Sequence, residues 1–174
     1  KILCSNKYFI LITLAFAIIY TSLGLTGGSR IYYAKYVLGN EMINSTMTLF
    51  NYIPTILTIM LIPIFAKKFG KIKALFVGFL FYGAGLILEI AGPVNLPMIY
   101  GGLVLQGIGH AALYSCLFAI VGDVVDYSEW KDGIREEGLT YSVTSFGQKI
   151  GTGLGTAALG WILAAGNYNG TAAV

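Results

Sequence analysis

Long apolar stretches separated by short polar connections dominate the chain. Five of them, at residues 8–26, 46–66, 74–92, 94–122 and 139–165, are mostly apolar. About 20 such residues in a helix cross a hydrocarbon core of roughly 30 Å. The second stretch contains Pro54 and Pro63, which a membrane helix tolerates when neighbours satisfy the freed carbonyls. A signal peptide would give one short apolar stretch near the start, so the pattern predicts an all-α, polytopic membrane protein with about five transmembrane helices.

Positive charges gather on one side of the predicted membrane. The lysine-rich side holds Lys1, Lys7, Lys67, Lys68, Lys71, Lys73, Lys131 and Arg135. The opposite side carries only Arg30 and Lys35, in a loop expected after the first stretch. Lys and Arg are enriched in cytoplasmic loops, so we expect the lysine-rich side and the N-terminus to be cytoplasmic.

Composition narrows the functional classes further. Hydrophobic residues make up 56% of the chain and charged residues 11%, and the mean hydropathy is +0.75. These values exclude an ordinary soluble domain or a disordered chain, and the few scattered basic residues speak against a nucleic-acid partner. Cys4 and Cys116 lie in apolar context, which favours buried reduced thiols over a disulfide framework. The sequence contains neither metal-ligand spacing nor a Ser/His/Asp set, so we expect no enzyme.

Lys149 is the most informative charge. It lies ten residues after Leu139, so at 1.5 Å per residue it should be about 15 Å into the membrane core. On a helical wheel Tyr141, Ser145, Thr152 and Thr156 fall on its side, while Gly147 and Gly151 fall nearly opposite. Either this polar stripe lines a hydrated cavity, or Lys149 pairs structurally with an acid elsewhere in the bundle. The spacing favours the cavity, with the glycines permitting close helix packing.

Two further features leave alternatives open. His110 is either a proton carrier or a hydrogen-bonded histidine of the bundle, and the second interpretation is favoured. The loop expected at residues 123–138 concentrates acids, including Asp123 and Asp126, which should share one helix face. Those acids form either a solvated charge run or a breakable ion-pair latch with the basic segment Lys67–Lys73.

The stretch from Gly122 to Leu163, GDVVDYSEWKDGIREEGLTYSVTSFGQKIGTGLGTAALGWIL, resembles the signature of the glycoside–pentoside–hexuronide:cation symporters. These form the melibiose-permease-like branch of the major facilitator superfamily. YYAKYVLGN at Tyr32–Asn40 is similar to the segment that ends their seventh helix. The resemblance implies two six-helix halves around a sugar cavity. The chain, residues 1–174, would be part of the C-terminal half, with five spans corresponding to helices 7–11 of twelve, and without the N-terminal half and the last helix.

The resemblance also implies roles for individual residues. Lys149 matches the lysine near the sugar and cation sites, and Thr144, Ser145 and Tyr114 match positions that contact or border the sugar. The alternatives are bundle packing for Tyr114 and hydroxyls that bond back to their own helix for Thr144 and Ser145. The residues that match the network closing the cytoplasmic side are Asp123, Asp126, Glu129, Arg135 and Glu137.

The function expected from this resemblance is secondary active transport of a sugar or glycoside coupled to a cation. The coupling ion is Na⁺ or H⁺, bound mainly by the missing half, with no further cofactor and no metal site in this half. The partners would be the sugar, the lipid bilayer and the N-terminal half, in a multi-pass protein of the plasma or inner membrane. Two alternatives remain: a non-transporting paralogue or truncated product, and a transporter of a non-sugar amphiphile.

Overall fold

The computed structural model describes residues 7–133, 135 and 137–168, so Lys1 and Cys4 lie outside the described residues. Every regular element in the described part is a helix. The helices are α2 (Lys7–Tyr36), α3 (Ile43–Ile59), α4 (Ile62–Phe69), α5 (Lys71–Ala91), α6 (Leu96–Asp132) and α7 (Glu137–Ala165). The all-α class predicted from the apolar stretches is confirmed.

The helices form two compact units. One combines the chain up to Ile31 with the chain from Tyr127 onward, and the other is Tyr32–Asp126. We call them the α2–α7 unit and the central unit. Most of α2 and all of α7 belong to the first, whereas α3, α4, α5 and most of α6 belong to the second.

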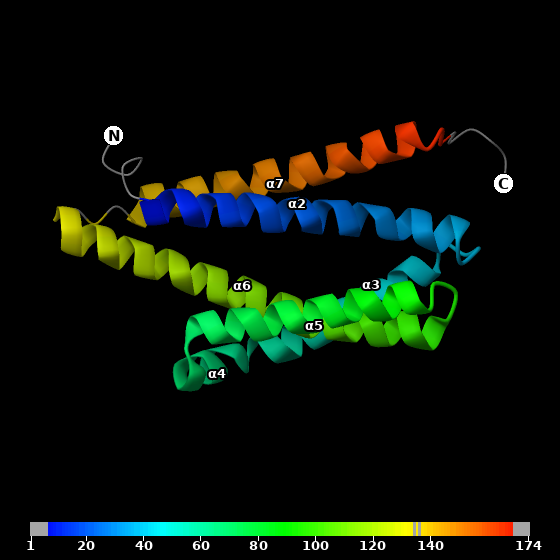
Figure 1. The fold of residues 1–174 in the computed structure, drawn as a ribbon, viewed down its shortest axis with the longest axis horizontal. Coiled ribbons are helices and arrows are strands. Elements are labelled where there is room, and N and C mark those ends of the chain that lie inside the picture. The colour runs from blue at the N-terminus through cyan, green and yellow to red at the C-terminus, as the bar shows by residue number, and fades with distance from the viewer. Residues whose placement is uncertain (1–6, 134, 136, 169–174) are drawn as a thin grey trace. The chain divides into compact units, whose positions relative to one another are not determined.

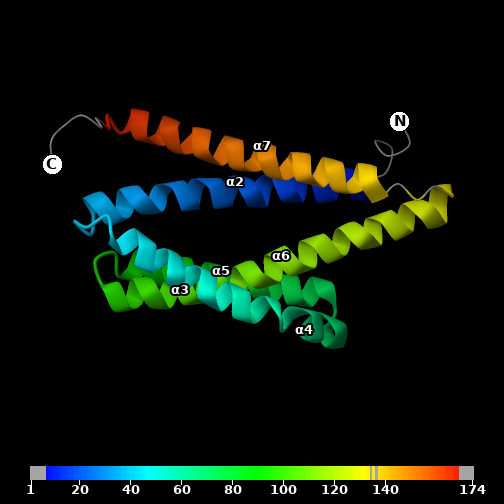
Figure 2. The ribbon, with the colours of Figure 1, turned by 180° about the vertical axis from the view of Figure 1, so that it is seen from behind.

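In the α2–α7 unit, the two long helices run side by side (Figures 1 and 2). Glycines allow this close approach. A Cβ atom added at Gly151 would lie 2.5 Å from the carbonyl oxygen of Ala17, and one added at Gly24 would lie 2.7 Å from that of Thr152. Small residues commonly bring membrane helices into backbone contact in this way. The predicted packing role of the α7 glycines is therefore confirmed.

In the central unit, α3 is tied to α6 by side-chain hydrogen bonds. Asn51 Nδ2 donates to the carbonyl oxygen of Leu103 at 3.1 Å, and Thr55 Oγ1 lies 3.0 Å from the carbonyl oxygen of Gly107. Asn51 and Thr55 are both buried. Such bonds hold helices together where no water is present to satisfy polar groups.

The second apolar stretch folds as two helices. α3 and α4 meet at an angle of 52°, with the break between Ile59 and Ile62. Pro63 explains the position of this break: it cannot donate to the carbonyl oxygen of Ile59, and its ring would clash with that group in a continuous helix. Pro54, by contrast, lies inside α3 without ending it.

Three helices, α2, α5 and residues 96–131 of α6, are long and apolar enough to cross a membrane. The bent pair of α3 and α4 gives a fourth candidate, by length and composition of the described residues. α7 is long enough but carries Ser, Thr, Gln and Lys149 along its length, and it is not among these candidates. Its predicted membrane span, at residues 139–165, stays a prediction.

Two segments that we expected to be loops are wholly or mostly helical. Arg30 and Lys35 lie within α2, which continues to Tyr36, and most of the acidic segment continues α6 as far as Asp132. The apolar pattern marks only the part of a helix that faces lipid or protein, and a helix can continue into water. α6 ends before Gly133, which has a φ of +70° and adopts the left-handed conformation that often terminates helices.

Candidate functional site

α7 presents two chemically different faces. Its buried face consists of Thr140, Thr144, Gly147, Gly151 and Gly155. The opposite face is exposed and carries Tyr141, Ser145, Lys149, Thr152 and Thr156. We call this second set the α7 polar stripe. The face expected from the helical wheel is therefore confirmed, since the glycines pack on α2 and the hydroxyls and Lys149 point away from the buried face.

Lys149 lies near the middle of α7 with its side chain exposed. Among the described residues it forms no ion pair. An ammonium group in a hydrocarbon region costs about 2.5–3.5 kcal/mol on insertion scales, so such a charge faces a bundle interior or a hydrated cavity. That Lys149 lies in such surroundings stays a prediction, together with the membrane span of α7.

Ser145 and Thr144 occupy different faces. Ser145 belongs to the polar stripe, and its hydroxyl donates to the carbonyl oxygen of Tyr141 at 2.8 Å. Thr144 is buried and donates to the carbonyl oxygens of Tyr141 and Thr140, at 2.9 and 3.2 Å. Both hydroxyl hydrogens thus bond within α7, as the alternative interpretation predicted. The structure places Ser145, but not Thr144, on the face of Lys149.

The hydroxyl hydrogen of Ser145 is already donated to its own helix, so this hydroxyl can only accept further hydrogen bonds. A serine oxygen retains lone pairs after donating its hydrogen. Ser145 can therefore accept a hydrogen bond from a hydroxyl of a ligand, whereas Lys149 can only donate. An exposed acceptor one turn from an ammonium group suits a polyhydroxylated molecule.

Tyr114 belongs to the central unit, where it extends a cluster of rings. Its ring centroid lies 5.7 Å from that of His110, which lies 5.0 Å from that of Tyr82 on α5. His110 is buried, whereas Tyr114 is half-buried. The ring of Tyr114 is thus supported from one side, and its role as a sugar-stacking platform stays a prediction.

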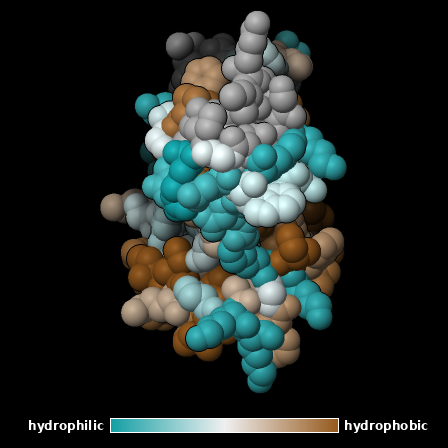
Figure 3. All heavy atoms as spheres, turned by 90° about the vertical axis from the view of Figure 1, so that its left-hand side faces the viewer, coloured by the Kyte–Doolittle hydropathy of each residue, from teal (hydrophilic) through white to brown (hydrophobic). Residues whose placement is uncertain are grey.

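The charged network predicted near the lysine-rich side contains real ion pairs. In the central unit, Lys71 Nζ lies 2.6 Å from Asp123 Oδ1. In the α2–α7 unit, Arg135 lies 2.6 Å from Glu129 and also pairs with Glu137. Figure 3 faces the end at which α4 ends and α5 begins, where hydrophilic residues gather beside apolar ones.

These pairs are exposed to solvent, with between 39% and 57% of each side chain accessible. The hydrogen bonds that Arg135 donates to the carboxylates of Glu129 and, second, of Glu137 raise the pKa of Arg135 above its usual range, so the guanidinium stays charged. Exposed ion pairs of this kind contribute little and break easily. The arrangement therefore suits contacts that form and break. Asp126 is also exposed on α6, but its role in the network stays a prediction.

Sequence reasoning missed three polar contacts inside the helix pairs. Gln148 on α7 donates to the hydroxyl of Tyr20 on α2 at 2.8 Å, and Asn51 and Thr55 bond to α6. Asn51 and Thr55 are spaced by four residues around Pro54 in an otherwise apolar stretch, which was the available signal. The described residues contain no group of three His, Cys, Asp or Glu that could hold a metal ion. Cys116 is a buried free thiol, as predicted.

Several known proteins that resemble this chain in sequence are named as transporters or carriers. An isoprimeverose transporter of Lactiplantibacillus pentosus is 31% identical over 78% of this chain and 26% of its own length. A glucuronide carrier protein homolog of Escherichia coli is 30% identical over 80% of this chain and 31% of its own length. A raffinose carrier protein of Pediococcus pentosaceus is 26% identical over 93% of this chain and 25% of its own length.

The chain therefore spans between 25% and 31% of the lengths of these relatives. No solved structure gives a significant match. The family described as MFS/sugar transport protein matches residues 1–174. The names of the family and of these relatives describe transporters rather than enzymes. With its helical fold, its candidate membrane spans and this match over its whole length, the chain belongs to the MFS/sugar transport protein family.

Proposed function

We propose that the full-length protein is a secondary active transporter that moves a sugar or glycoside together with a cation, Na⁺ or H⁺. The observation that carries this proposal is the α7 polar stripe, which combines the exposed ammonium of Lys149 with the acceptor oxygen of Ser145 on a helix anchored through its opposite face. The sugars in the printed names of the relatives support the substrate class.

In this proposal Lys149 couples the two cargoes. An acid of the N-terminal half pairs with Lys149 when the cation is absent, and binding of the cation releases that lysine toward the sugar. Cation binding then favours sugar binding, and by linkage the sugar favours the cation by the same factor. Ser145 accepts from a sugar hydroxyl, and Tyr114 stacks on the ring. Thr144 acts indirectly, through the packing of α7 on α2.

The exposed ion pairs supply the conformational part of the proposal. We place the lysine-rich side in the cytoplasm, in the plasma or inner membrane, because positive residues concentrate there. The Lys71–Asp123 pair and the contacts of Arg135 with Glu129 and Glu137 are then part of a cytoplasmic gate, to which Asp126 also contributes. Transport follows from rocking of the two halves around a site near the membrane midplane.

A binding experiment tests the substrate class and the coupling ion together. Purified full-length protein would be heated in detergent with a panel of glycosides, pentosides and hexuronides, each with Na⁺ or with K⁺, at two pH values. We expect one class of sugar to raise the unfolding temperature, because a ligand that binds only the folded state stabilises it. We also expect that effect to require Na⁺ or low pH.

Stabilisation by no sugar under any of these conditions would contradict the proposal. Stabilisation by a sugar that is equal with and without Na⁺, and at both pH values, would keep sugar binding but contradict cation coupling. A parallel titration with long-chain sulfonates would reveal a non-sugar amphiphile as the cargo.

A further inference from the structure

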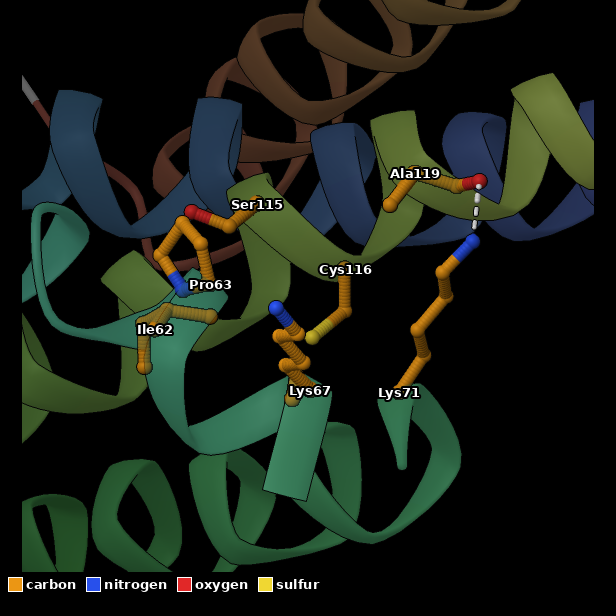
Figure 4. Close-up of a pocket in the computed structure, with 8 residues that line it drawn as sticks. Ile62, Pro63, Lys67, Lys71, Ser115, Cys116 and Ala119 are labelled. Carbon is orange, nitrogen blue, oxygen red and sulfur yellow. Dashed lines mark hydrogen bonds between the residues drawn. The ribbon is translucent and has the colours of Figure 1, made fainter. Parts of the chain in front are cut away.

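A pocket of about 360 Å³ lies in the central unit between α4, the start of α5 and α6 (Figure 4). Of its lining, the function proposed above uses only Lys71, in the pair with Asp123. It is lined by Ile62, Pro63, Ala66, Lys67, Lys71, Ser115, Cys116 and Ala119. We call it the α4 pocket. Its lining is mostly apolar, apart from the two lysines and Ser115.

The pocket is polar at one end and apolar at the other. Its apolar end is formed by Ile62 and Pro63, where α4 begins at the break in the bent pair. Lys67 comes five residues after Ile62, about 7.5 Å further along the helix axis, in the last turn of α4. On α6, Ala119 lies one turn closer than Ser115 to the charged end of that helix. The α4 wall therefore runs from apolar to charged, and Lys71, which contacts Ala119 and Asp123, marks the same end of the pocket on α6 as the charged one.

The charged end carries an excess of positive charge. Lys71 donates to the carbonyl oxygen of Ala119 at 3.2 Å, as Figure 4 shows, and pairs with Asp123. Lys67 forms no ion pair among the described residues, and in Figure 4 its side chain extends toward Cys116. Lys71 is thus neutralised by Asp123, and the charge of Lys67 remains available to an anion.

We propose that the α4 pocket binds an anionic phospholipid of the leaflet on the lysine-rich side. The phosphate group lies against Lys67, with Lys71 at its edge, and one acyl chain packs on Ile62, Pro63 and Ala66. This occupant fits the pocket because an anionic lipid in its leaflet has the same polarity, with charge at the surface and hydrocarbon toward the membrane interior. Basic pockets between membrane helices bind anionic head groups by this chemistry.

Lipid retention by the full-length protein tests this proposal. The protein would be exchanged into equal mixtures of phosphatidylglycerol and phosphatidylcholine with identical acyl chains, and bound lipids would be counted by native mass spectrometry. We expect wild-type protein to retain phosphatidylglycerol preferentially. We expect Lys67→Gln to reduce that preference roughly fivefold, which corresponds to about 1 kcal/mol per lysine near an anionic surface.

Lys68→Gln and Lys73→Gln are the matched controls, because they remove the same charge from exposed lysines of the same segment that do not line the pocket. Both should keep the preference for phosphatidylglycerol. An equal loss in all three variants would overturn the proposal, since it would show diffuse surface attraction. Equal retention of both lipids by wild-type protein would overturn it as well.

Crosslinking provides a test that does not depend on charge variants. A photoreactive amino acid at position 66, in the pocket, should form adducts with phosphatidylglycerol in preference to phosphatidylcholine, and inorganic phosphate should not compete. The same group at position 65 faces a second, mostly apolar pocket of about 210 Å³ beside α4 and should show no head-group preference. Adducts at position 66 with another segment of the protein would overturn the proposal.

Discussion

Lys149 is an exposed charge near the middle of α7, the helix whose membrane span stays a prediction. Its neighbours Ser145 and Thr152 donate their hydroxyl hydrogens to carbonyl oxygens of α7 rather than to a partner helix. The hydroxyl hydrogens of Ser145, Thr152 and Thr156 are thus donated within α7, whereas their oxygens can still accept hydrogen bonds. This leaves the ammonium as the strongest donor on that face, available to a sugar or to an acid of the other half.

Replacing Lys149 by Ala should uncouple transport. We expect gradient-driven accumulation of the sugar to fall by about 5- to 150-fold, the range of typical coupling free energies. Thr156→Ala is the matched control, since it lies on the same stripe about 10.5 Å further along α7 and should leave accumulation unchanged. Uptake in vesicles measures both variants. Normal ion-driven uptake by Lys149→Ala would contradict the coupling role.

Ser145 and Thr144 should give different phenotypes although they are adjacent. Ser145→Ala removes an exposed acceptor and should raise the KM for the sugar roughly two- to tenfold, as expected for one neutral hydrogen bond. Thr144→Val keeps the shape of a buried side chain and should change stability more than KM. Transport kinetics and thermal unfolding separate the two effects. An increased KM in Thr144→Val alone would reverse the assignment.

The amino-acid sequence was sufficient to single out Lys149, because a charge in the middle of a long helix stands out against its neighbours. It was not sufficient to separate Thr144 from Ser145. A helical wheel places Thr144 between the two stripes, and only the approach of α2 decides which side is buried. Family resemblance could not decide this either, since it grouped both hydroxyls as sugar contacts.

At the scale of elements, the pairing of α2 with α7 depends on particular glycines. Gly151 faces the carbonyl oxygen of Ala17 and the side chain of Tyr20, whereas a Cβ atom at Gly153 would have no neighbour within 4 Å. A backbone oxygen cannot move aside as a flexible side chain can. The two glycines lie only two residues apart on α7, but a methyl group fits at Gly153 and not at Gly151.

Gly151→Ala should destabilise the protein, and Gly153→Ala should not. We expect the first substitution to lower the free energy of unfolding by about 1–3 kcal/mol, as overpacking typically does. The second should leave stability unchanged or raise it by up to about 1 kcal/mol, because Ala favours helix. Thermal unfolding of the solubilised full-length protein measures both. Equal effects of the two substitutions would contradict the described packing.

Helix ends were less predictable than helix positions. Apolar stretches located all the long helices, but α2 and α6 continue past them because no Pro or left-handed Gly ends the helix at the membrane boundary. The bend after Ile59 follows from Pro63, although the sequence alone did not distinguish it from Pro54. Near Pro54, the side chains of Asn51 and Thr55 hold α3 against α6.

At the scale of the whole molecule, the exposed ion pairs should influence which side of the transporter is open. Asp123→Asn breaks the pair with Lys71, and we expect it to increase opening toward the lysine-rich side by up to about fivefold, since exposed pairs contribute about 0.2–1 kcal/mol. The measurement is the rate at which a maleimide added from that side labels the Ser145→Cys variant.

Glu41→Gln is the control for this experiment. Glu41 also forms an exposed pair, at 2.9 Å from Lys35, but it lies in the connection after α2 on the side expected to face outward. Its removal should not increase labelling from the lysine-rich side. Equal acceleration by both variants, or none by Asp123→Asn, would contradict a gate built on the Lys71–Asp123 pair.

Cation-coupled sugar transport is the central claim, and uptake into membrane vesicles tests it most directly. Vesicles containing the full-length protein would receive radiolabelled glycosides, pentosides and hexuronides, with an imposed Na⁺ gradient, an H⁺ gradient or neither. We predict that at least one sugar accumulates above its external concentration only when one of the gradients is present. Folded, membrane-inserted protein that accumulates no sugar under either gradient would contradict the claim.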